Sequence, residues 1–415
     1  MLKYTWFALL MVTNTNCVIN NVCPSIQDYS TVRTNSNCWY DVAADQNATN
    51  IIKSYGYGVE IHKVTAPDGY ITTLFRIITY SDAGRKVPVL LQHGFLYSGA
   101  AFIALGKDSI GFILADAGYD VWISNMRGTE YSEEHIRLSA DNIKFWNFDL
   151  DDVSLKDFPA QLNYILQNNQ RNGKIIYIGH SIGGSIPLMY ASSFPQESNS
   201  VVKLFILLAP NGGMENSKSS LLRDLAPFSN IIVRLFINTE TAKYLSSKSN
   251  ATKLVKSACG QDSIFMSYCV ETLNSIVMGP QNQIDASVIP IFFNQFPAGS
   301  SLKILKHLVD SIRFGLRAYD YDSENFEIYG SRLPPVYNVS KIEVPTYIVY
   351  SPSDWCISDK DSENLYNRLS KSAKVHGKYK IEDIGFNHND FLYGRRAKAI
   401  LYNKLLQLIE SIRDT

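Results

Sequence analysis

Apolar positions along this chain fall into short runs that alternate with amphipathic segments. Nearly continuous apolar runs, typical of strands buried on both faces, occur at residues 88–92, 119–123, 175–178, 203–209 and 344–350. Longer segments with helical spacing lie between several of them, for example residues 151–167. This alternation predicts an α/β fold with a mostly parallel sheet and helices on both faces.

A predicted hairpin precedes these buried strands, and a helix follows the last one. Residues 57–64 alternate as a half-buried strand, Pro67-Asp68-Gly69 supplies a turn, and residues 71–79 return as the partner strand. Near the end, residues 378–384 predict a further strand and residues 397–412 a closing amphipathic helix.

The alternation stops in the middle of the chain. From about residue 211 to about residue 340, apolar residues follow helical spacing alone, as at 221–236 and 284–296. We therefore predict one α/β core built from residues 21–210 and 341–415, with a helical cap of residues 211–340 inserted into it. The 415 residues are enough for a large core with such an insertion.

Composition and the N-terminus narrow the functional classes. The chain has 39 basic and 39 acidic residues and no basic cluster, which disfavours a nucleic-acid partner and favours a small neutral or apolar ligand. Residues 1–20 resemble a secretory signal peptide, because Lys3 precedes an apolar run that is too short to span a bilayer. We predict a secreted or lysosomal protein without a transmembrane segment. Glycosylation acceptors then lie at Asn47, Asn250 and Asn338.

Cysteine usage agrees with a secretory protein but does not fix a disulfide pattern. Of the six cysteines, one lies in the leader. Cys259 and Cys269 can close a short loop, Cys23 and Cys38 can form a second bridge, and Cys356 is then unpaired. Metal-binding patterns of the C-x-x-C or H-E-x-x-H type do not occur in the sequence, so we expect neither a metal nor another cofactor.

The apolar run at residues 175–178 ends in Gly179-His180-Ser181-Ile182-Gly183. This G-x-S-x-G pattern fits the nucleophile elbow, in which a sharp strand-to-helix turn lifts a serine hydroxyl above the sheet. The pattern alone is weak, because glycine and serine are common residues. The rest of the chain has to supply a base and an acid.

Both partners occur in the chain order that this architecture requires, namely serine, acid and histidine. Asp354 follows the strand at residues 344–350, with Asp359 in the same loop as an alternative acid, and His388 follows the last strand. The backbone N–H groups of Phe95, after the strand at residues 88–92, and of Ile182 are the candidate oxyanion donors. These positions predict nucleophilic catalysis of acyl transfer.

Several motifs in one order give the chain a specific resemblance. They are Leu91-Gln92-His93-Gly94-Phe95, Gly118-Tyr119-Asp120-Val121-Trp122, Asn125-Met126-Arg127-Gly128-Thr129-Glu130-Tyr131-Ser132, Phe145-Trp146, the elbow, Phe296-Pro297-Ala298-Gly299-Ser300-Ser301, Tyr319-Asp320-Tyr321 and Asn387-His388-Asn389-Asp390-Phe391. Together they resemble the acid lipase family, from about Tyr55 to the end of the chain.

The resemblance implies an α/β-hydrolase core, a helical cap with a movable lid, and hydrolysis of acylglycerols or sterol esters at a lipid–water interface. By position, Ser181 matches the nucleophile, Asp354 the acid and His388 the base. The pair Cys259 and Cys269 resembles the cap disulfide of the family. We expect the lid within Leu221 to Phe236.

Two positions depart from the family pattern. Ile182 stands where the family usually has glutamine, which keeps the backbone donor but lowers the polarity, so we expect substrate preference to differ near the elbow. Ser353 precedes Asp354 in place of the usual asparagine. Two other functions are compatible with the fold: a lipid-binding or storage protein without turnover, and an enzyme with the same chemistry that acts on a peptide or a small soluble ester. The sequence does not address the oligomeric state.

Overall fold

The computed structural model describes residues 19–79, 87–169, 173–243, 245–260, 263, 265–269 and 275–412. The predicted leader, residues 1–20, lies outside the described residues except for its last two. Among the described helices, none combines the length and the apolar character needed to cross a bilayer.

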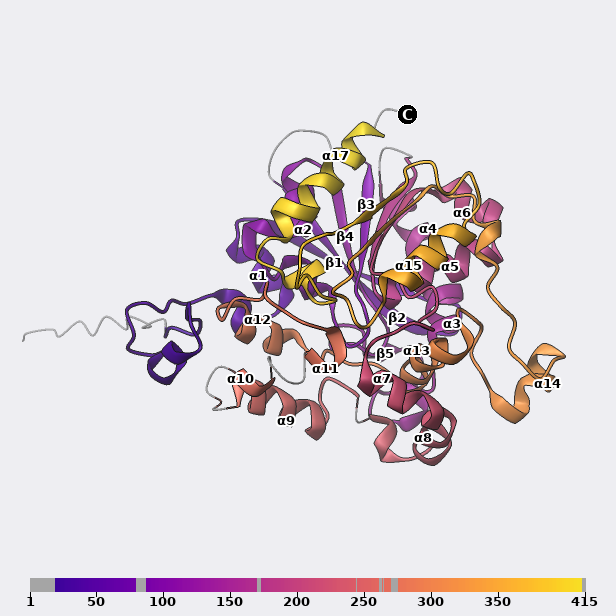
Figure 1. Cartoon of the computed structure of the whole chain (residues 1–415), viewed down its shortest axis with the longest axis horizontal. Helices are drawn as coiled ribbons and strands as arrows, with labels where there is room; N and C mark the ends of the chain where they lie inside the picture. Colours follow the sequence, from indigo (N-terminus) through magenta and orange to yellow (C-terminus); the bar gives the residue numbers. More distant parts are fainter. Residues whose placement is uncertain are drawn as a thin grey trace, which may run out of the picture.

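A twisted sheet forms the centre of the molecule (Figure 1). Its strands are β1 (Gly58–Thr65), β2 (Tyr70–Ile78), β3 (Pro88–Gln92), β4 (Asp120–Asn125), β5 (Glu134–His135), β6 (Ile175–His180), β7 (Val202–Leu208), β8 (Thr346–Tyr350) and β9 (Lys378–Lys380). The order across the sheet is β1-β2-β4-β3-β6-β7-β8-β9, with β5 beside β2. From β4 to β9 neighbours are parallel, whereas β1, β2 and β5 pair antiparallel. The predicted α/β class, hairpin and buried strands are therefore confirmed.

Helices cover both faces of the sheet, as predicted. Helices α2 (Ile110–Asp116) and α17 (Asn403–Ser411) lie on one face, and α4 (Phe158–Asn168), α5 (Ile182–Ser193), α6 (Pro195–Val201) and α15 (Asp359–Arg368) on the other (Figure 1). The short helices α1 (Ala48–Ser54), α3 (Leu150–Asp152) and α16 (Asp390–Tyr393) complete this part. The strands between these layers read as apolar runs because both of their faces are buried.

The predicted helix at residues 151–167 is continuous but not regular. A π-helical turn, Val153–Asp157, joins α3 to α4. Pro159 follows this turn, and a proline inside a helix has no N–H to donate and crowds the carbonyl four residues earlier. A locally widened turn is the usual response to such a break in the hydrogen-bond ladder.

Helices without intervening long strands occupy the middle of the chain and lie below the sheet in Figure 1. They are α7 (Ser220–Leu225), α8 (Ser229–Phe236), α9 (Asn250–Cys259), α10 (Met266–Tyr268), α11 (Ser275–Met278), α12 (Val288–Gln295), α13 (Leu302–Phe314) and α14 (Asn325–Tyr329). We call this helical part the cap. Its helical character follows the sequence pattern, while its boundaries at residues 211 and 340 stay a prediction.

Two disulfides join cysteines that are close in sequence. Cys23 is bonded to Cys38 and Cys259 to Cys269, whereas Cys356 is free and buried. The two bridges share one apolar cluster, so the N-terminal loop packs against the cap. The sequence left the disulfide pairing open, and in the structure each disulfide closes a short loop between cysteines that are neighbours along the chain.

Candidate active site

Ser181 sits at the sharp turn between β6 and α5. Its backbone has φ 58° and ψ −122°, a conformation that is strained for a residue with a side chain. The Ser181 N–H donates to the Leu208 carbonyl at the end of β7, and the Ser181 carbonyl accepts from Gly184. These bonds hold the strained turn in place, so the geometry is that of a nucleophile elbow.

Two glycines let the neighbouring backbone approach this turn. A Cβ atom at residue 94 would lie 2.9 Å from the Ser181 Cβ, and one at residue 183 would lie 2.5 Å from the Gln92 carbonyl oxygen. Both distances are shorter than side chains allow, so glycine is required at each position. The loop after β3, which carries Phe95, is thereby pressed against the elbow.

Asp354 and His388 form a buried pair at the ends of β8 and β9. His388 Nδ1 lies 2.7 Å from Asp354 Oδ2, and the two side chains are 2% and 0% exposed. Asp354 Oδ1 accepts from the Ile357 N–H at 2.9 Å, which fixes the carboxylate. With Nδ1 facing the carboxylate, Nε2 is the nitrogen left to accept a proton.

Asp359 and Ser353, which lie near Asp354 in the sequence, have contacts of their own. Asp359 starts α15, is partly exposed and lies 3.7 Å from Lys218 Nζ, so the acid that faces His388 is Asp354. Ser353, which replaces the usual asparagine, accepts a hydrogen bond from the Gly385 N–H at 3.0 Å. The residue before the acid therefore ties the acid loop to the loop that carries His388.

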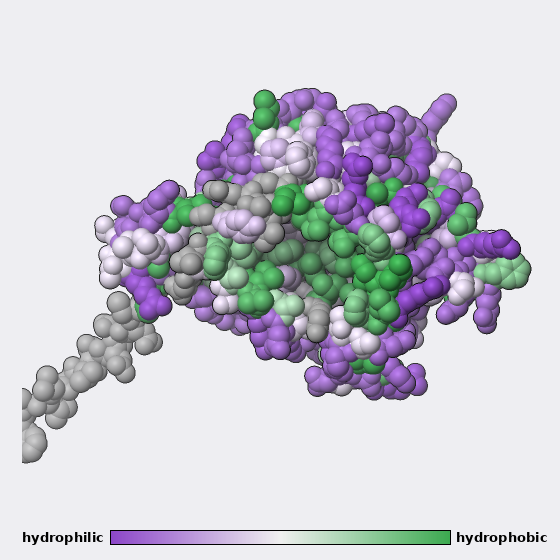
Figure 2. All heavy atoms as spheres, turned by 60° about the horizontal axis from the view of Figure 1, so that its bottom comes forward, coloured by the Kyte–Doolittle hydropathy of each residue, from purple (hydrophilic) through white to green (hydrophobic). Residues whose placement is uncertain are grey.

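Ser181 and His388 line the same cavity, which has a volume of about 330 Å³ and lies between the core and the cap. Its other walls are mostly apolar side chains from both parts of the molecule, among them Phe95, Leu222, Phe292 and Leu308. Figure 2 shows apolar side chains gathered around a hollow on the face of the molecule that carries the cap. The arrangement places the Ser181 hydroxyl and the His388 ring at the wall of an apolar pocket.

Ile182 is fully buried, and it is not among the described residues that line this cavity. The expectation that its side chain alters substrate preference near the elbow therefore has no support in the geometry. Its place as the first residue of α5 leaves its N–H at the positive end of a helix dipole.

Sequence reasoning missed two buried histidines beside the elbow. His93 Nδ1 donates to the Gly94 carbonyl at 2.8 Å, and His93 Nε2 accepts from the Met126 N–H at 3.0 Å. Burial lowers the pKa of His93 to about 4, so the ring is neutral near pH 7. His180 Nε2 lies 2.9 Å from the His388 carbonyl oxygen, and burial lowers its pKa as well. The motifs contain both residues, but only the fold shows that they position the loops.

Asp390, next to the base loop, carries a strongly perturbed carboxyl group. Burial, together with the charges of Asp354 and Asp383, raises its pKa to about 8, although the Asn387 N–H donates to it at 2.6 Å. The protonated form avoids a second negative charge beside Asp354.

An Asp390→Asn variant should gain stability relative to the wild type as the pH rises. Between pH 4 and pH 8 folded Asp390 keeps a proton that the unfolded chain has lost, so the wild type loses stability as the pH rises through this interval. An asparagine side chain does not titrate, so the variant lacks this loss of stability. We expect similar melting temperatures near pH 4 and a variant that melts roughly 5 °C or more higher at pH 8. A difference that does not change with pH in thermal denaturation would contradict this account.

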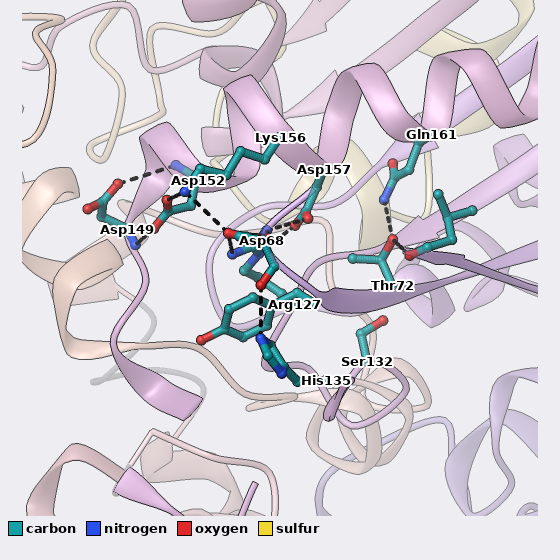
Figure 3. A network of polar contacts seen from close by, with 12 residues as sticks. Asp68, Thr72, Arg127, Ser132, His135, Asp149, Asp152, Lys156, Asp157 and Gln161 are labelled. Atoms are coloured by element: carbon teal, nitrogen blue, oxygen red, sulfur yellow. Dashed lines mark hydrogen bonds and ion pairs between the residues drawn. The ribbon is translucent and has the colours of Figure 1, made fainter. Parts of the chain in front are cut away.

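Arg127 anchors the loop that follows β4, and Figure 3 shows the polar contacts around it. Its guanidinium, fully buried, bonds Asp157 at 2.5 and 2.8 Å and Asp68 at 2.9 and 3.1 Å. It also lies 4.0 Å from the centre of the Tyr70 ring. The motif residue Arg127 therefore anchors the loop after β4 to two other segments, the turn between β1 and β2 at Asp68 and the π-helical turn at Asp157. It lies away from the cavity.

Family models match this chain over most of its length. The model of the alpha/beta hydrolase fold matches residues 87–394, and that of the partial alpha/beta-hydrolase lipase region matches residues 48–106. A solved monoglyceride lipase from Saccharomyces cerevisiae has the same fold, with a TM-score of 0.53 at 14% identity over 85% of this chain and 95% of that one. The fold and the site thus define an α/β-hydrolase.

Curated relatives narrow this class. Lipase 1 of Drosophila melanogaster is 32% identical over 88% of this chain and 80% of its own length. The gastric triacylglycerol lipase of Bos taurus is 29% identical over 88% and 91%, and the human lysosomal acid lipase/cholesteryl ester hydrolase is 29% identical over 89% and 92%. The chain belongs to the acid lipase family of the α/β-hydrolases, and as such it is an ester-hydrolysing serine hydrolase.

Proposed function

We propose that the chain is a secreted or lysosomal lipase that cleaves acylglycerols or sterol esters through an acyl-enzyme on Ser181. The observation that carries the proposal is that Ser181 and the buried His388–Asp354 pair meet at one apolar cavity. A binding protein has no physical need for this arrangement, whereas a hydrolase needs all three groups.

Each proposed step uses a group of this chain. His388 Nε2 takes the Ser181 proton while the hydroxyl attacks the ester carbonyl, and Asp354 stabilises the imidazolium. The N–H groups of Phe95 and Ile182 donate to the oxyanion. His388 then protonates the leaving alcohol, and the same residues activate a water molecule that releases the fatty acid.

Apolar surface on the cap supports a lipid substrate. Large apolar side chains are exposed on α7, α8 and α9 and in the turn that joins α7 to α8, including Leu221, Phe228, Ile231, Leu235 and Leu254. Exposed apolar patches of this kind mark contacts with lipid or protein. The predicted lid, Leu221 to Phe236, consists of α7, α8 and the turn between them. That this segment moves stays a prediction.

The disulfides and the exposed glycosylation acceptors support secretion or delivery to the lysosome. The two disulfides suit an oxidising compartment. Asn47, Asn250 and Asn338 are all exposed, so each is accessible for glycosylation. Relatives named gastric and lysosomal lipases agree with this location.

The substrate class is tested with emulsified triacylglycerol, a sterol ester and a soluble short-chain ester, with the Ser181→Ala protein as the blank. Faster hydrolysis of the emulsified lipids supports a lipase. Activity confined to the soluble ester would replace this proposal by the small-ester esterase. Binding of lipid without any hydrolysis would replace it by the lipid-binding protein.

Replacing both Leu235 and Leu254 by serine should weaken action at an interface selectively. These side chains are 61% and 69% exposed and are not among the residues that line the cavity. Each substitution removes apolar surface that would otherwise enter the lipid. We therefore expect the double variant to be about tenfold less active on emulsified triacylglycerol. Activity on a soluble ester should stay unchanged.

The matched control for this variant is Ile61→Ser, since Ile61 on β1 is 57% exposed and lies outside the cap. Equal losses on both substrates, or an equal loss in the control, would show that the cap surface does not contact the lipid.

A further inference from the structure

A cluster of three ionisable side chains lies away from the active site, between the core and the cap. Asp149 and Asp151 stand at the start of α3, and His307 lies on cap helix α13. One ligand atom of each residue lies within 4.8 Å of those of the other two. We call these residues the Asp-Asp-His cluster.

His307 has one unused ring nitrogen. The side chain is 7% exposed, and Nε2 lies 2.8 Å from the Arg317 carbonyl oxygen, to which it can only donate. In the neutral ring this bond places the proton on Nε2, and Nδ1 then carries a free lone pair. Nδ1 is buried and has no hydrogen-bond partner among the described residues. A backbone carbonyl that orients the second ring nitrogen is the usual support of a histidine metal ligand.

The two carboxylates are also held in place by their neighbours. Asp149 accepts from the N–H groups of Asp151 and Asp152 through one oxygen, and from the Tyr321 hydroxyl at 3.0 Å through the other. Figure 3 shows Asp149 at this helix start, beside Asp152. A carboxylate oxygen has two lone pairs, so Oδ1, with two donors, is saturated, whereas Oδ2, with one, keeps capacity for a further partner.

Asp151 is held in the same way. Its Oδ1 accepts from the Tyr337 hydroxyl and its Oδ2 from the Tyr319 N–H, both at 2.8 Å. Asp151 also lines a second cavity of about 340 Å³, together with Tyr337 and Lys341. Asp151 is therefore the member of the cluster that borders this cavity.

Two described lysines near the cluster make other contacts. Lys156 is bonded to Asp152 and Asp68, and Lys303 Nζ lies 5.1 Å from the ring centres of Tyr319 and Tyr321. No ion pair between a described lysine or arginine and either Asp149 or Asp151 is present.

We propose that the Asp-Asp-His cluster binds one divalent transition-metal ion, for which zinc fits the donor set. Imidazole nitrogen and carboxylate oxygen are both ligands that zinc accepts, whereas calcium and magnesium prefer oxygen ligands alone. The ion would join the core at α3 to the cap at α13, so its role is structural. The sequence expectation of no metal site rested on local motifs, and this cluster combines residues that are far apart in the chain.

The test is zinc binding to the full chain after treatment with a chelator, followed by calorimetry with zinc chloride and by thermal denaturation. We expect one equivalent of zinc to bind and to raise the melting temperature. His307→Gln keeps a donor for the Arg317 carbonyl but removes Nδ1, and Asp151→Asn removes the charge. Each should weaken zinc binding at least tenfold.

His376→Gln is the matched control, because His376 lies in a partly exposed loop outside the cluster, and it should bind zinc as the wild type does. Calcium and magnesium should not replace zinc. Binding at the His388–Asp354 pair would instead inhibit ester hydrolysis and persist in both cluster variants. That result, or the absence of zinc binding to the wild type, would overturn the proposal, and a water molecule would then bridge the three side chains. If His307→Gln fails to fold, zinc binding by Asp151→Asn is the deciding measurement. The readout is independent of the proposed lipase activity.

Discussion

Replacing Ser181 by alanine is expected to lower kcat for ester hydrolysis by about 10⁴- to 10⁶-fold. Alanine has no hydroxyl, so an acyl-enzyme cannot form, while the oxyanion donors and the cavity stay in place. The smaller side chain also fits the turn, where Gly94 already lies against the Ser181 Cβ. Steady-state kinetics on a soluble ester measure the effect, with circular dichroism to show that the fold is kept.

A folded Ser181→Ala protein with more than about one per cent of wild-type activity would contradict the proposed nucleophile. A contaminating esterase is excluded by purifying the wild type and the variant side by side through the same steps.

Asp354→Asn is expected to lower kcat by about 10⁴-fold. Asp354 accepts the His388 Nδ1–H, whereas an asparagine amide facing Nδ1 as a donor would leave the proton on Nε2. The histidine would then present the wrong nitrogen to Ser181. The kcat of the variant on a soluble ester, over a range of pH, measures this loss.

Asp359→Asn is the matched control for this variant. Asp359 lies in the same loop region but faces Lys218, so its replacement should leave kcat within about twofold of the wild type. A large loss in this control with little loss in Asp354→Asn would reverse the assignment of the acid.

Most of the core is readable from the sequence because its strands are buried on both faces. Leu90, Val121, Ile178 and Leu207 are 0% exposed, and such strands leave continuous apolar runs in the sequence. The limits of the last strand are less visible. Strand β9 covers only Lys378–Lys380 of the predicted residues 378–384, because a partly exposed edge strand has little apolar pattern.

The candidate site is predictable where chain order fixes it. The elbow, the acid and the base each follow a strand whose end lies at one edge of the sheet, so Ser181, Asp354 and His388 can be selected before the fold is known. The choice of Asp354 over Asp359 needs the structure, since both residues follow β8 closely in the sequence.

Contacts between distant segments could not be predicted, because no local pattern encodes them. The Tyr97 hydroxyl bonds Asn389, and Cys356 lines the cavity beside His388. The Asp-Asp-His cluster joins a helix start in the core to a helix of the cap in the same way. By contrast, the unusual Ile182 stands out in the sequence, yet it is absent from the described cavity wall.

Covalent labelling tests the central claim most directly, because it reports on the nucleophile without any choice of substrate. The wild-type protein is treated with a fluorophosphonate, and the labelled peptide is identified by mass spectrometry. The account predicts one adduct per chain, located on Ser181, slower labelling in His388→Ala and none in Ser181→Ala. A folded wild-type protein that stays unlabelled, or an adduct on a different residue, would contradict it.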